Sequence, residues 1–562
     1  MAAMTIRIPA PPRPAFTIPA TVEQLLWGAS LFWMLAANRL LFGAALRERS
    51  LAEPATWGFA LAVAALLTTL HFLLLAPWAN RITVKPLLAV LTVGTALATY
   101  FMQRYGVYLD PSMLRSVLRT DVAEARELWS WTLLPHLTVF AGLPLLVLSR
   151  VRLVVRPWPR AAAVRLATVA GALAVAAGTL LAVFQPMASL MRSHKEMRYL
   201  VTPGNYLWSM AAVLARDARG AAAPRQPIGL DAAPGPSWSQ RQRPRVVVLV
   251  VGETARAANW GLNGYARQTT PELARLPLLS FGDVTACGTD TETSVPCMFA
   301  PVGRREYDEA RIRGSESLLH VAARAGVTVH WRDNQSGCKG VCDGLPTESV
   351  VSLNPAGLCA DGRCLDEGLL AGLDARLARA AGTQLWVLHM LGNHGPSYFR
   401  RYPPAFARHQ PACESDDLRQ CSAEQIVNAY DNALRYTDHV LASLIGKLQA
   451  QAGRVDSTLL FVSDHGESLG ESGLFLHGMP YAIAPDVQTQ VPMLMWFSAG
   501  TPAAAGLDLA CLRARAAQPA AHDHLFHTLL ALLDVRTSLY EPAWDLTAGC
   551  RPGAGDAAGG AS

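Results

Sequence analysis

The chain has 562 residues, of which 51% are hydrophobic and only 16% are charged, and its formal net charge is +6. This balance is too apolar for an ordinary soluble protein and indicates that lipid solvates part of the chain. The length allows a membrane region and one large soluble domain. Because the sequence has no basic arm with interleaved aromatic residues and no zinc-finger spacing, no nucleic-acid partner is expected.

Five apolar stretches in the first third of the chain are each long enough to cross the hydrocarbon core of a bilayer. They are residues 25–46, 56–78, 86–103, 128–149 and 161–184. The first is too long for a removable signal peptide and is predicted to be a signal anchor. Residues 1–184 are therefore expected to form a transmembrane domain of five helices.

Basic residues without acidic neighbours gather in three segments outside these stretches. The amino-terminal tail carries Arg7 and Arg13, and the second loop carries Arg81 and Lys85. The fourth loop carries Arg150, Arg152, Arg156 and Arg160. The positive-inside rule therefore places the amino terminus in the cytoplasm, and five spans place everything after residue 184 on the other side.

The ten cysteines support that placement, because all of them lie in the second half of the chain. An even number confined to one region is typical of disulfides in an oxidising compartment. Reduced, buried thiols are the alternative, and metal binding is disfavoured because no CxxC occurs. Pairing between neighbours is expected: Cys287 with Cys297, Cys338 with Cys342, Cys359 with Cys364, Cys413 with Cys421, and Cys511 with Cys550.

Residues 185–244 connect the membrane region to the soluble part. They begin with mixed apolar and basic residues, typical of helices that lie on a membrane, and end in a linker rich in Pro, Gly, Ala and Arg from Arg216 onward. Residues 551–562 are rich in Gly and Ala and are expected to be disordered.

Residues 245–550 alternate short hydrophobic runs with helical segments such as Asn428–Leu448. This alternation predicts an open α/β domain with a mostly parallel sheet that is covered on both faces. The predicted strands are Val246–Val251, Val327–Trp331, Leu385–Met390 and Leu459–Val462.

Polar side chains follow each predicted strand directly. Since the carboxyl ends of parallel strands meet at one edge, these residues should form a single pocket. Glu253, Asp464 and His465 offer the oxygen and nitrogen ligands of a catalytic Zn²⁺ site, with Gly466 allowing the chain to turn. The alternative is that the two acids cap helices.

A nucleophile would complete such a site. The segment between Cys287 and Cys297 contains four candidate hydroxyls, and its spacing does not choose among them: Thr289, Thr291, Thr293 and Ser294. Zn²⁺ would lower the pKa of a bound hydroxyl, whereas the alternative is a hydroxyl-rich surface turn. Lys339, His394 and His477 are candidates for holding a phosphoryl group, a second metal or the leaving group.

Long motifs along the chain resemble the lipid A phosphoethanolamine transferases, the family associated with polymyxin and colistin resistance. They are Val251–Arg256, Asn263–Tyr265, Cys287–Phe299, Trp331–Asn334, Gly392–Pro396, Ser463–Glu471 and Leu476–Pro480. The resemblance implies an alkaline-phosphatase/sulfatase-like fold in a bacterial inner-membrane enzyme whose catalytic domain faces the periplasm.

The resemblance also implies a set of site residues. It places one Zn²⁺ on Glu253, Asp464, His465 and Thr291, and it selects Thr291 as the nucleophile. It places Lys339, His394 and His477 around the phosphoethanolamine, with further zinc possible at the two histidines. Thr120 and Glu124 would contact lipid, although Ser116 stands where the family commonly has Asn.

The implied reaction transfers phosphoethanolamine from phosphatidylethanolamine to a lipid A phosphate through a covalent intermediate on Thr291. The product carries an added amine, which lowers the negative charge of the outer membrane and its attraction for cationic peptides such as polymyxin. A monomer is expected, with membrane lipids as its partners. The alternatives are transfer of phosphoethanolamine or phosphoglycerol to another glycolipid or core sugar, and a degenerate receptor without activity.

Overall fold

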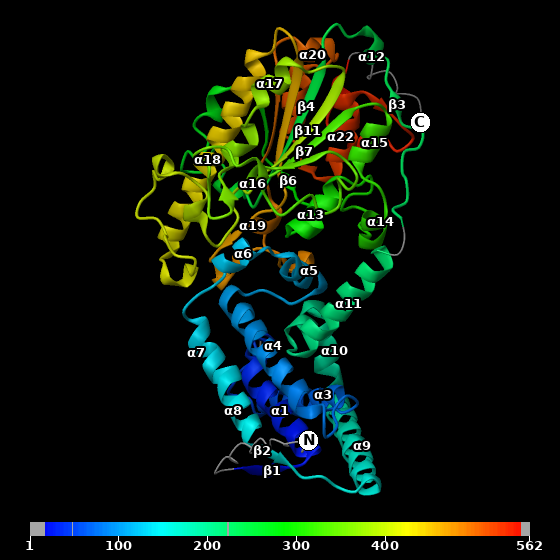
Figure 1. Cartoon of the computed structure of the whole chain (residues 1–562), viewed down its shortest axis with the longest axis vertical. Coiled ribbons are helices and arrows are strands. Elements are labelled where there is room, and N and C mark those ends of the chain that lie inside the picture. The colour runs from blue at the N-terminus through cyan, green and yellow to red at the C-terminus, as the bar shows by residue number, and fades with distance from the viewer. Residues whose placement is uncertain (1–16, 48, 222–223, 552–562) are drawn as a thin grey trace, which may run out of the picture. The chain divides into compact units, whose positions relative to one another are not determined.

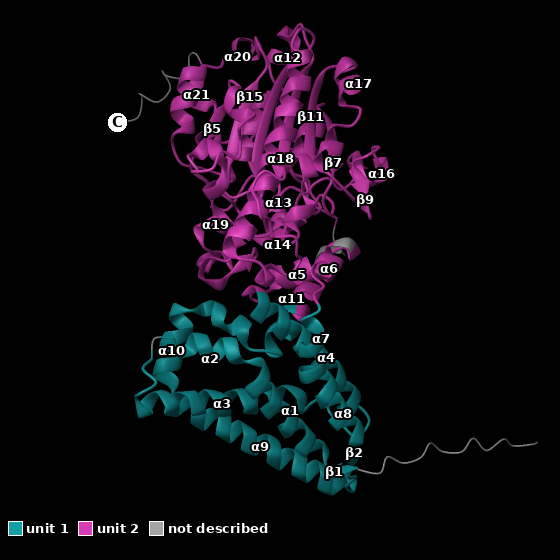
Figure 2. Ribbon diagram, turned by 90° about the vertical axis from the view of Figure 1, so that its left-hand side faces the viewer, with its two compact units in different colours: residues 1–104, 131–209 teal, residues 105–130, 210–562 magenta. Residues whose placement is uncertain are grey.

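The computed structural model describes residues 17–47, 49–221 and 224–551, and its contacts divide the chain into two compact units. Residues 1–104 and 131–209 form one unit, and residues 105–130 and 210–562 form the other (Figure 2). Arg7, Arg13 and the tail after Arg551 lie outside the described residues.

The loop of residues 105–130 belongs to the second unit, although it falls within the transmembrane domain 1–184 expected from the sequence. It carries helices α5 (Pro111–Arg119) and α6 (Val122–Glu127). Arg115 on α5 is buried and forms ion pairs with Asp217 and Glu309 of the same unit. Buried charges require partners, and here the partners belong to the soluble part of the chain. The other expected boundaries, at residues 184, 244 and 550, stay predictions.

The first unit is helical. Four helices in the described residues are long and apolar enough to cross a membrane: α3 (Pro54–Leu75), α4 (Val84–Tyr105), the continuous segment Leu133–Arg150 and α9 (Trp158–Ala182). The segment Leu133–Arg150 consists of α7 (Leu133–Leu137), a π-helical turn (Thr138–Gly142) and α8 (Leu143–Arg150). The bent pair α1 (Val22–Ala37) and α2 (Arg39–Ala45) is a fifth candidate if the pair counts as one span.

The bend of 60° between α1 and α2 interrupts the continuous stretch 25–46 expected from the sequence. Asn38 occupies the break and is fully buried. Its side-chain amide donates to the carbonyl oxygens of Trp33 and Thr202, each at 2.9 Å, and its side-chain oxygen accepts from the Thr202 amide. The bend therefore depends on a long-range contact that helical periodicity does not show.

The segment after α9 contains α10 (Phe184–Ser193), a 3₁₀ turn (Lys195–Leu200) and α11 (Gly204–Ala221). The expected helices of this region are therefore present. The linker expected from Arg216 is wrong in its first residues, because α11 continues to Ala221.

A seven-stranded sheet forms the centre of the second unit, with the order β5-β15-β12-β4-β11-β7-β8 (Figure 1). The central strands β12, β4, β11 and β7 are mutually parallel, and β15 runs antiparallel to β12. This confirms the predicted mostly parallel sheet. The strands are β4 (Arg245–Gly252), β5 (Leu279–Phe281), β7 (Thr328–Asp333), β8 (Thr347–Ser349), β11 (Thr383–His389), β12 (Asp456–Ser463) and β15 (Met493–Phe497).

Both faces of this sheet are covered, because successive side chains of a strand point to opposite faces. On β4, Val247, Leu249 and Val251 belong to one buried cluster, together with residues of α13 (Thr291–Met298), α15 (Leu318–Arg324) and α22 (Asp523–Leu533). Alternate residues such as Val248 pack on the other face against α17 (Leu373–Ala378) and α18 (Ala423–Ala450). The resulting three layers explain the continuous hydrophobic strands.

All ten cysteines form disulfides, and the pairing is the one expected between neighbours. Every bridge lies in the second unit. This agrees with the oxidising environment inferred from the sequence.

Candidate metal centre and active site

The register of the central strands brings their carboxyl ends to one level. Gly252 of β4 pairs with Ser463 of β12, and Asp333 of β7 pairs with His389 of β11. Glu253 and Asp464 follow the paired residues Gly252 and Ser463, so both carboxylates leave the sheet side by side. The edge expected to hold the polar residues is therefore the edge at which they meet.

Glu253, Asp464 and His465 form a compact, completely buried cluster. Their candidate ligand atoms all lie within 4.8 Å of one another. His465 Nε2 lies 3.4 Å from Glu253 Oε1 and 3.3 Å from Asp464 Oδ2. The other imidazole nitrogen, Nδ1, is 2.9 Å from the carbonyl oxygen of Gly466. That contact fixes the ring so that Nε2 faces the carboxylates, as in many metal sites.

Two carboxylate oxygens in this cluster suit a cation. Glu253 Oε1 and Asp464 Oδ2 are buried and accept no hydrogen bond from any described residue. Burial raises the pKa of Glu253 well above its usual range, and the neighbouring charge of Asp464 raises it further. A divalent cation would remove this cost, and the two-carboxylate, one-imidazole donor set suits Zn²⁺. The residues present therefore fit the expected metal.

Thr291 is the hydroxyl that reaches this cluster. Its Oγ1 donates to Glu253 Oε2 at 3.1 Å and lies 3.4 Å from His465 Nε2. Thr289 and Ser294 instead donate to the backbone carbonyls of Met479 and Asp464. The contacts of these hydroxyls therefore favour Thr291 over Thr289 and Ser294 as the candidate nucleophile, a choice that sequence spacing alone did not allow.

Helix α13 begins at Thr291. Asp290 caps it by accepting from the Thr293 amide at 2.9 Å. The amino-terminal end of a helix carries partial positive charge, which favours a developing negative charge on the hydroxyl oxygen. The helix therefore presents Thr291, the candidate nucleophile, and contributes to the electrostatic environment of its hydroxyl.

Backbone shape around the cluster is constrained. Gly392 has a φ of +54°, and a Cβ there would lie 2.5 Å from the carbonyl oxygen of Glu253. The sequence predicts that Gly466 is needed because it lets the chain turn, and this reason is wrong. Gly466 is not among the residues with positive φ, and a Cβ there would collide with the carbonyl oxygen of Val487. Both glycines are needed for close approach of backbone to the site.

His477 and His394 lie beside the cluster. The ring centroid of His477 is 4.4 Å from that of His465 and 5.3 Å from that of His394. Glu467 holds His477 Nδ1 at 3.0 Å and is itself buried. Burial alone would lower the pKa of His477, but the charge of Glu467 raises it above its usual range. Glu467 follows His465 by two residues, which is the signal that could have assigned it a role.

Glu124 reaches this group from α6. Its Oε1 lies 3.3 Å from His394 Nε2. Thr120, predicted to act with Glu124, donates its hydroxyl to the Ser116 carbonyl oxygen at 2.8 Å. The structure therefore brings Glu124 to the site and leaves Thr120 bonded to its own helix.

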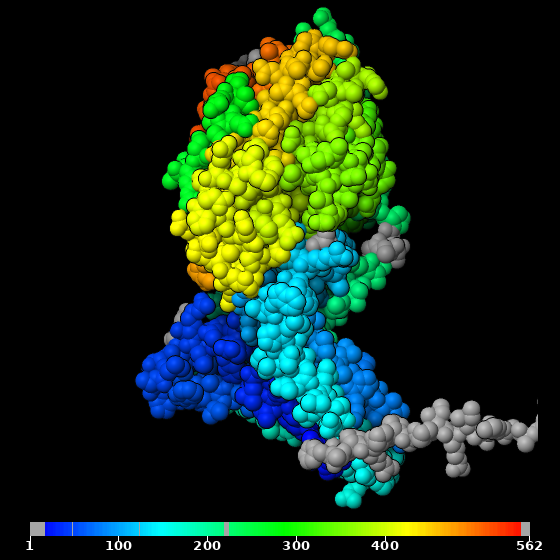
Figure 3. Space-filling model, turned by 60° about the vertical axis from the view of Figure 1, so that its left-hand side comes forward, coloured from blue at the N-terminus to red at the C-terminus, as the bar shows by residue number. Residues whose placement is uncertain are grey.

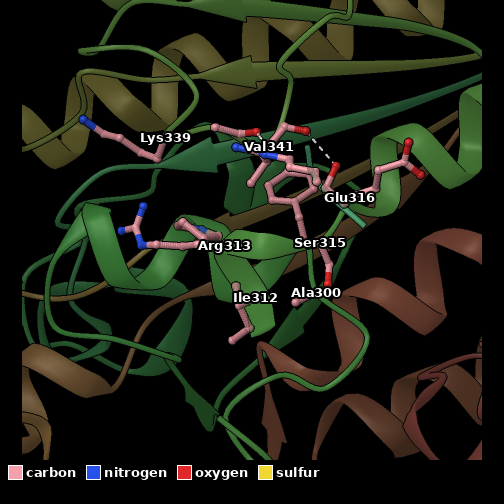
Figure 4. A pocket seen from close by; sticks show the side chains of 12 residues that line it. Ala300, Ile312, Arg313, Ser315, Glu316, Lys339 and Val341 are labelled. Carbon is pink, nitrogen blue, oxygen red and sulfur yellow. Dashed lines mark hydrogen bonds between the residues drawn. The ribbon is translucent and has the colours of Figure 1, made fainter. Parts of the chain in front are cut away.

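Ser336 and Glu292 hold the side chain of Lys339. Its Nζ is 2.6 Å from Ser336 Oγ and 3.3 Å from Glu292 Oε1. It also lines a small pocket, in which its side chain and that of Arg313 extend to the same side (Figure 4). Sequence reasoning missed Glu292 and also Gln335, whose amide donates to Glu253 Oε2 at 3.2 Å. Glu292 lies on α13, away from the strand ends, whereas Gln335 comes two residues after β7, and that position is the signal that could have assigned it a role.

Two family models match the chain. The sulfatase model matches residues 245–535, and the model described as phosphoethanolamine transferase EptA/EptB matches residues 67–218. Together they cover the site and most of the first unit.

Individual relatives match over most of their length. Phosphoethanolamine transferase EptA of Escherichia coli K12 is 37% identical over 84% of this chain and 86% of its own. Phosphatidylethanolamine transferase Mcr-1 of Escherichia coli is 36% identical over 91% and 94%. The solved structure of the integral membrane lipooligosaccharide phosphoethanolamine transferase A from Neisseria meningitidis aligns with a TM-score of 0.90 at 35% identity, covering 95% of this chain and 99% of that one.

Proposed function

The chain belongs to the phosphoethanolamine transferase family, and from that premise we propose that it transfers phosphoethanolamine from phosphatidylethanolamine to a phosphate of lipid A through a covalent intermediate on Thr291. The observation that carries the proposal is the hydroxyl of Thr291 at 3.1 Å from Glu253 Oε2, within the buried cluster. The predicted product has an added amine and less negative charge, which weakens the attraction of cationic peptides.

In the first half-reaction, the Thr291 hydroxyl gives its proton to Glu253 Oε2, to which it donates at 3.1 Å. Its Oγ forms a bond to the phosphorus of the donor, and the bond from phosphorus to the diacylglycerol oxygen breaks. His477, oriented by Glu467, is placed to give a proton to that leaving oxygen. Lys339 is placed to offset charge on the phosphoryl oxygens. In the second half-reaction, a phosphate oxygen of the acceptor passes its proton to His477 and forms a bond to the phosphorus. The bond from phosphorus to Thr291 Oγ breaks, and Glu253 returns the proton to that oxygen.

Glu253, Asp464, His465 and Thr291 would hold one zinc ion, with further ions near His394 and His477. When bound, the zinc supplies positive charge that lowers the pKa of the hydroxyl and stabilises the phosphoryl oxygens. The cost of leaving Glu253 Oε1 and Asp464 Oδ2 buried without a hydrogen bond supports this assignment.

The placement in the cell follows from the loop charges. We propose five spans, with the bent pair α1–α2 as the first, and an amino terminus in the bacterial cytoplasm. The catalytic domain then lies in the periplasm, where disulfides form, and the enzyme acts as a monomer.

Mass spectrometry of lipid A from cells that express the protein tests the function. Wild type should add phosphoethanolamine to lipid A, and Thr291→Ala should abolish the modification while the protein still accumulates in the membrane. Purified wild type given donor alone should carry phosphoethanolamine on the peptide that contains Thr291. Modified lipid A from cells with the Thr291→Ala variant would refute the covalent step, and unmodified lipid A beside another modified glycolipid would refute the acceptor.

A further inference from the structure

Helix α6 presents two acids to different surroundings. Glu124 contacts His394 at the catalytic cluster. Glu127, three residues later, is buried and pairs with Arg363 and Arg401 instead. The helix therefore separates the catalytic cluster from a second group of charges.

That second group lines a cavity of about 550 Å³, a volume within the range of small-molecule sites. Its walls are the end of α6, the hairpin of β9 (Cys359–Ala360) and β10 (Arg363–Cys364), and a segment from Leu391 to Asp416. In the space-filling view, the light-blue, yellow-green and yellow parts of the chain that contain these segments border one another on one face (Figure 3).

Four arginines and three acids line this cavity: Arg126, Arg363, Arg400, Arg401, Glu127, Asp361 and Asp416. Inside the cavity, Arg363 and Arg401 both form ion pairs with the carboxylate of Glu127, and Arg363 Nε lies 2.9 Å from it. Arg400 is half-exposed, and its Nη2 lies 3.4 Å from Asp416. Arg126 is exposed and forms no ion pair within the part of the chain that the structure describes. The cavity therefore has more cationic than anionic groups, and the least engaged cations are the two accessible to a ligand.

One wall of the cavity is also part of the segment from Leu391 to His394, which borders the cluster of Glu253, Asp464 and His465. Arg401 Nε donates to the carbonyl oxygen of His394 at 2.7 Å. Leu391, which lines the cavity, is followed by Gly392, the glycine that contacts Glu253. A molecule held in the cavity would therefore lie directly beside the group that transfers.

We infer that this cavity binds a phosphorylated sugar of the acceptor lipid and so places an acceptor phosphate next to Thr291. The inference rests on the proposed function and adds the acceptor's binding site. Arginine forks suit phosphate, because they offer paired hydrogen bonds. The donor has a single phosphate, which reacts at Thr291, and its amine is cationic. A separate arginine-lined cavity therefore serves a ligand with a further anionic group, as a phosphorylated glycolipid has.

Steady-state kinetics of the full-length protein in micelles separate the two substrates. The variant is Arg126→Gln combined with Arg400→Gln, and the control is Arg311→Gln, an exposed arginine on α14 (Glu309–Gly314) outside the cavity. We expect the KM for lipid A to rise about tenfold in the double variant, since two charge-assisted hydrogen bonds are lost. The KM for phosphatidylethanolamine, and the slow release of diacylglycerol without acceptor, should match the control.

Soluble competitors identify the ligand. Glucose 1-phosphate should inhibit transfer competitively with lipid A in wild type and much less in the double variant. An unchanged KM for lipid A, or an equal loss of donor cleavage, would overturn the inference. Equal inhibition by inorganic phosphate would also overturn it, because the cavity would then bind anions without regard to sugar. A wild-type protein that releases diacylglycerol but never modifies lipid A would refute the proposed acceptor itself.

Discussion

At the scale of single residues, Glu292 forms ion pairs with several basic side chains beside Thr291, the proposed nucleophile. Its buried carboxylate lies 2.8 Å from Arg119, 3.3 Å from Lys339 and 3.4 Å from Arg313. Because one carboxylate balances three cations, its removal leaves charges without a partner. We therefore expect Glu292 to position Lys339 rather than to touch substrate.

Glu292→Gln should lower kcat about tenfold or more, because Lys339 loses the contact that directs it toward the phosphoryl oxygens. It should also reduce the free energy of unfolding by about 1–3 kcal/mol, since Arg119 is partly exposed while Lys339 is buried. Kinetics and thermal unfolding check both effects. Glu306→Gln is the control, because Glu306 is exposed and its ion pair with Arg311 is long, at 3.9 Å. Restored kcat in Glu292→Asp would support positioning, whereas unchanged kcat in Glu292→Gln would contradict it.

Sequence reasoning reached the ligands at the strand ends but not their neighbours. Glu253 and Asp464 could be predicted because continuous hydrophobic runs mark buried parallel strands, and polar residues follow them. The hydroxyl could not be chosen by spacing alone, since four candidates occupy one short segment; family resemblance chose Thr291. The contact of Arg119 with Glu292 joins residues that are 173 positions apart in the chain, so no local sequence pattern predicts it.

At the scale of elements, the carboxylate of Asp110 caps the amino-terminal end of α5 and is buried, which disfavours its charged form. Asp110 accepts from the Met113 amide at 2.9 Å. Burial raises the pKa of Asp110 to about 6, and the charges of Asp290 and Glu309 add to this effect. The folded protein therefore holds a proton here at a pH where the unfolded chain has released it. Stability is greatest below the ordinary aspartate pKa and falls as the pH rises toward 6.

Asp110→Asn keeps a capping side chain and removes the buried charge. At pH 8 it should be more stable than wild type by as much as about 3 kcal/mol, and this advantage should vanish near pH 4. Thermal unfolding in detergent over this pH range measures the difference. Asp121→Asn, which alters the exposed cap of α6, is the matched control. A variant less stable than wild type at pH 8 would show that the cap outweighs the burial.

The observed helices and strands show which features of the fold a local hydrophobic pattern is able to predict. All four predicted strands are present, and each observed strand overlaps its predicted run. The bend at Asn38 was missed, because the helix pattern continues through it and only the contact with Thr202 reveals it. Hydrophobic periodicity thus locates elements, whereas tertiary hydrogen bonds decide where they break.

At the scale of the whole molecule, the five spans proposed above would place the two ends of the chain on opposite sides of the membrane. A reporter that fluoresces only in the cytoplasm should be active on the amino terminus and silent on the carboxyl terminus. A periplasmic phosphatase reporter should give the reverse pattern, with expression level as the control. Cytoplasmic activity at both ends would mean that α1 and α2 do not cross as one span.

The Cys287–Cys297 bridge encloses the segment that carries Thr291. A chain in which these two cysteines are reduced lacks the cross-link that closes the segment around this hydroxyl. We therefore expect a chain whose cysteines are reduced to transfer little or no phosphoethanolamine and to become active once the bridge forms. Oxidation of two sulfur atoms would in this way confine the reaction to a compartment in which disulfides form.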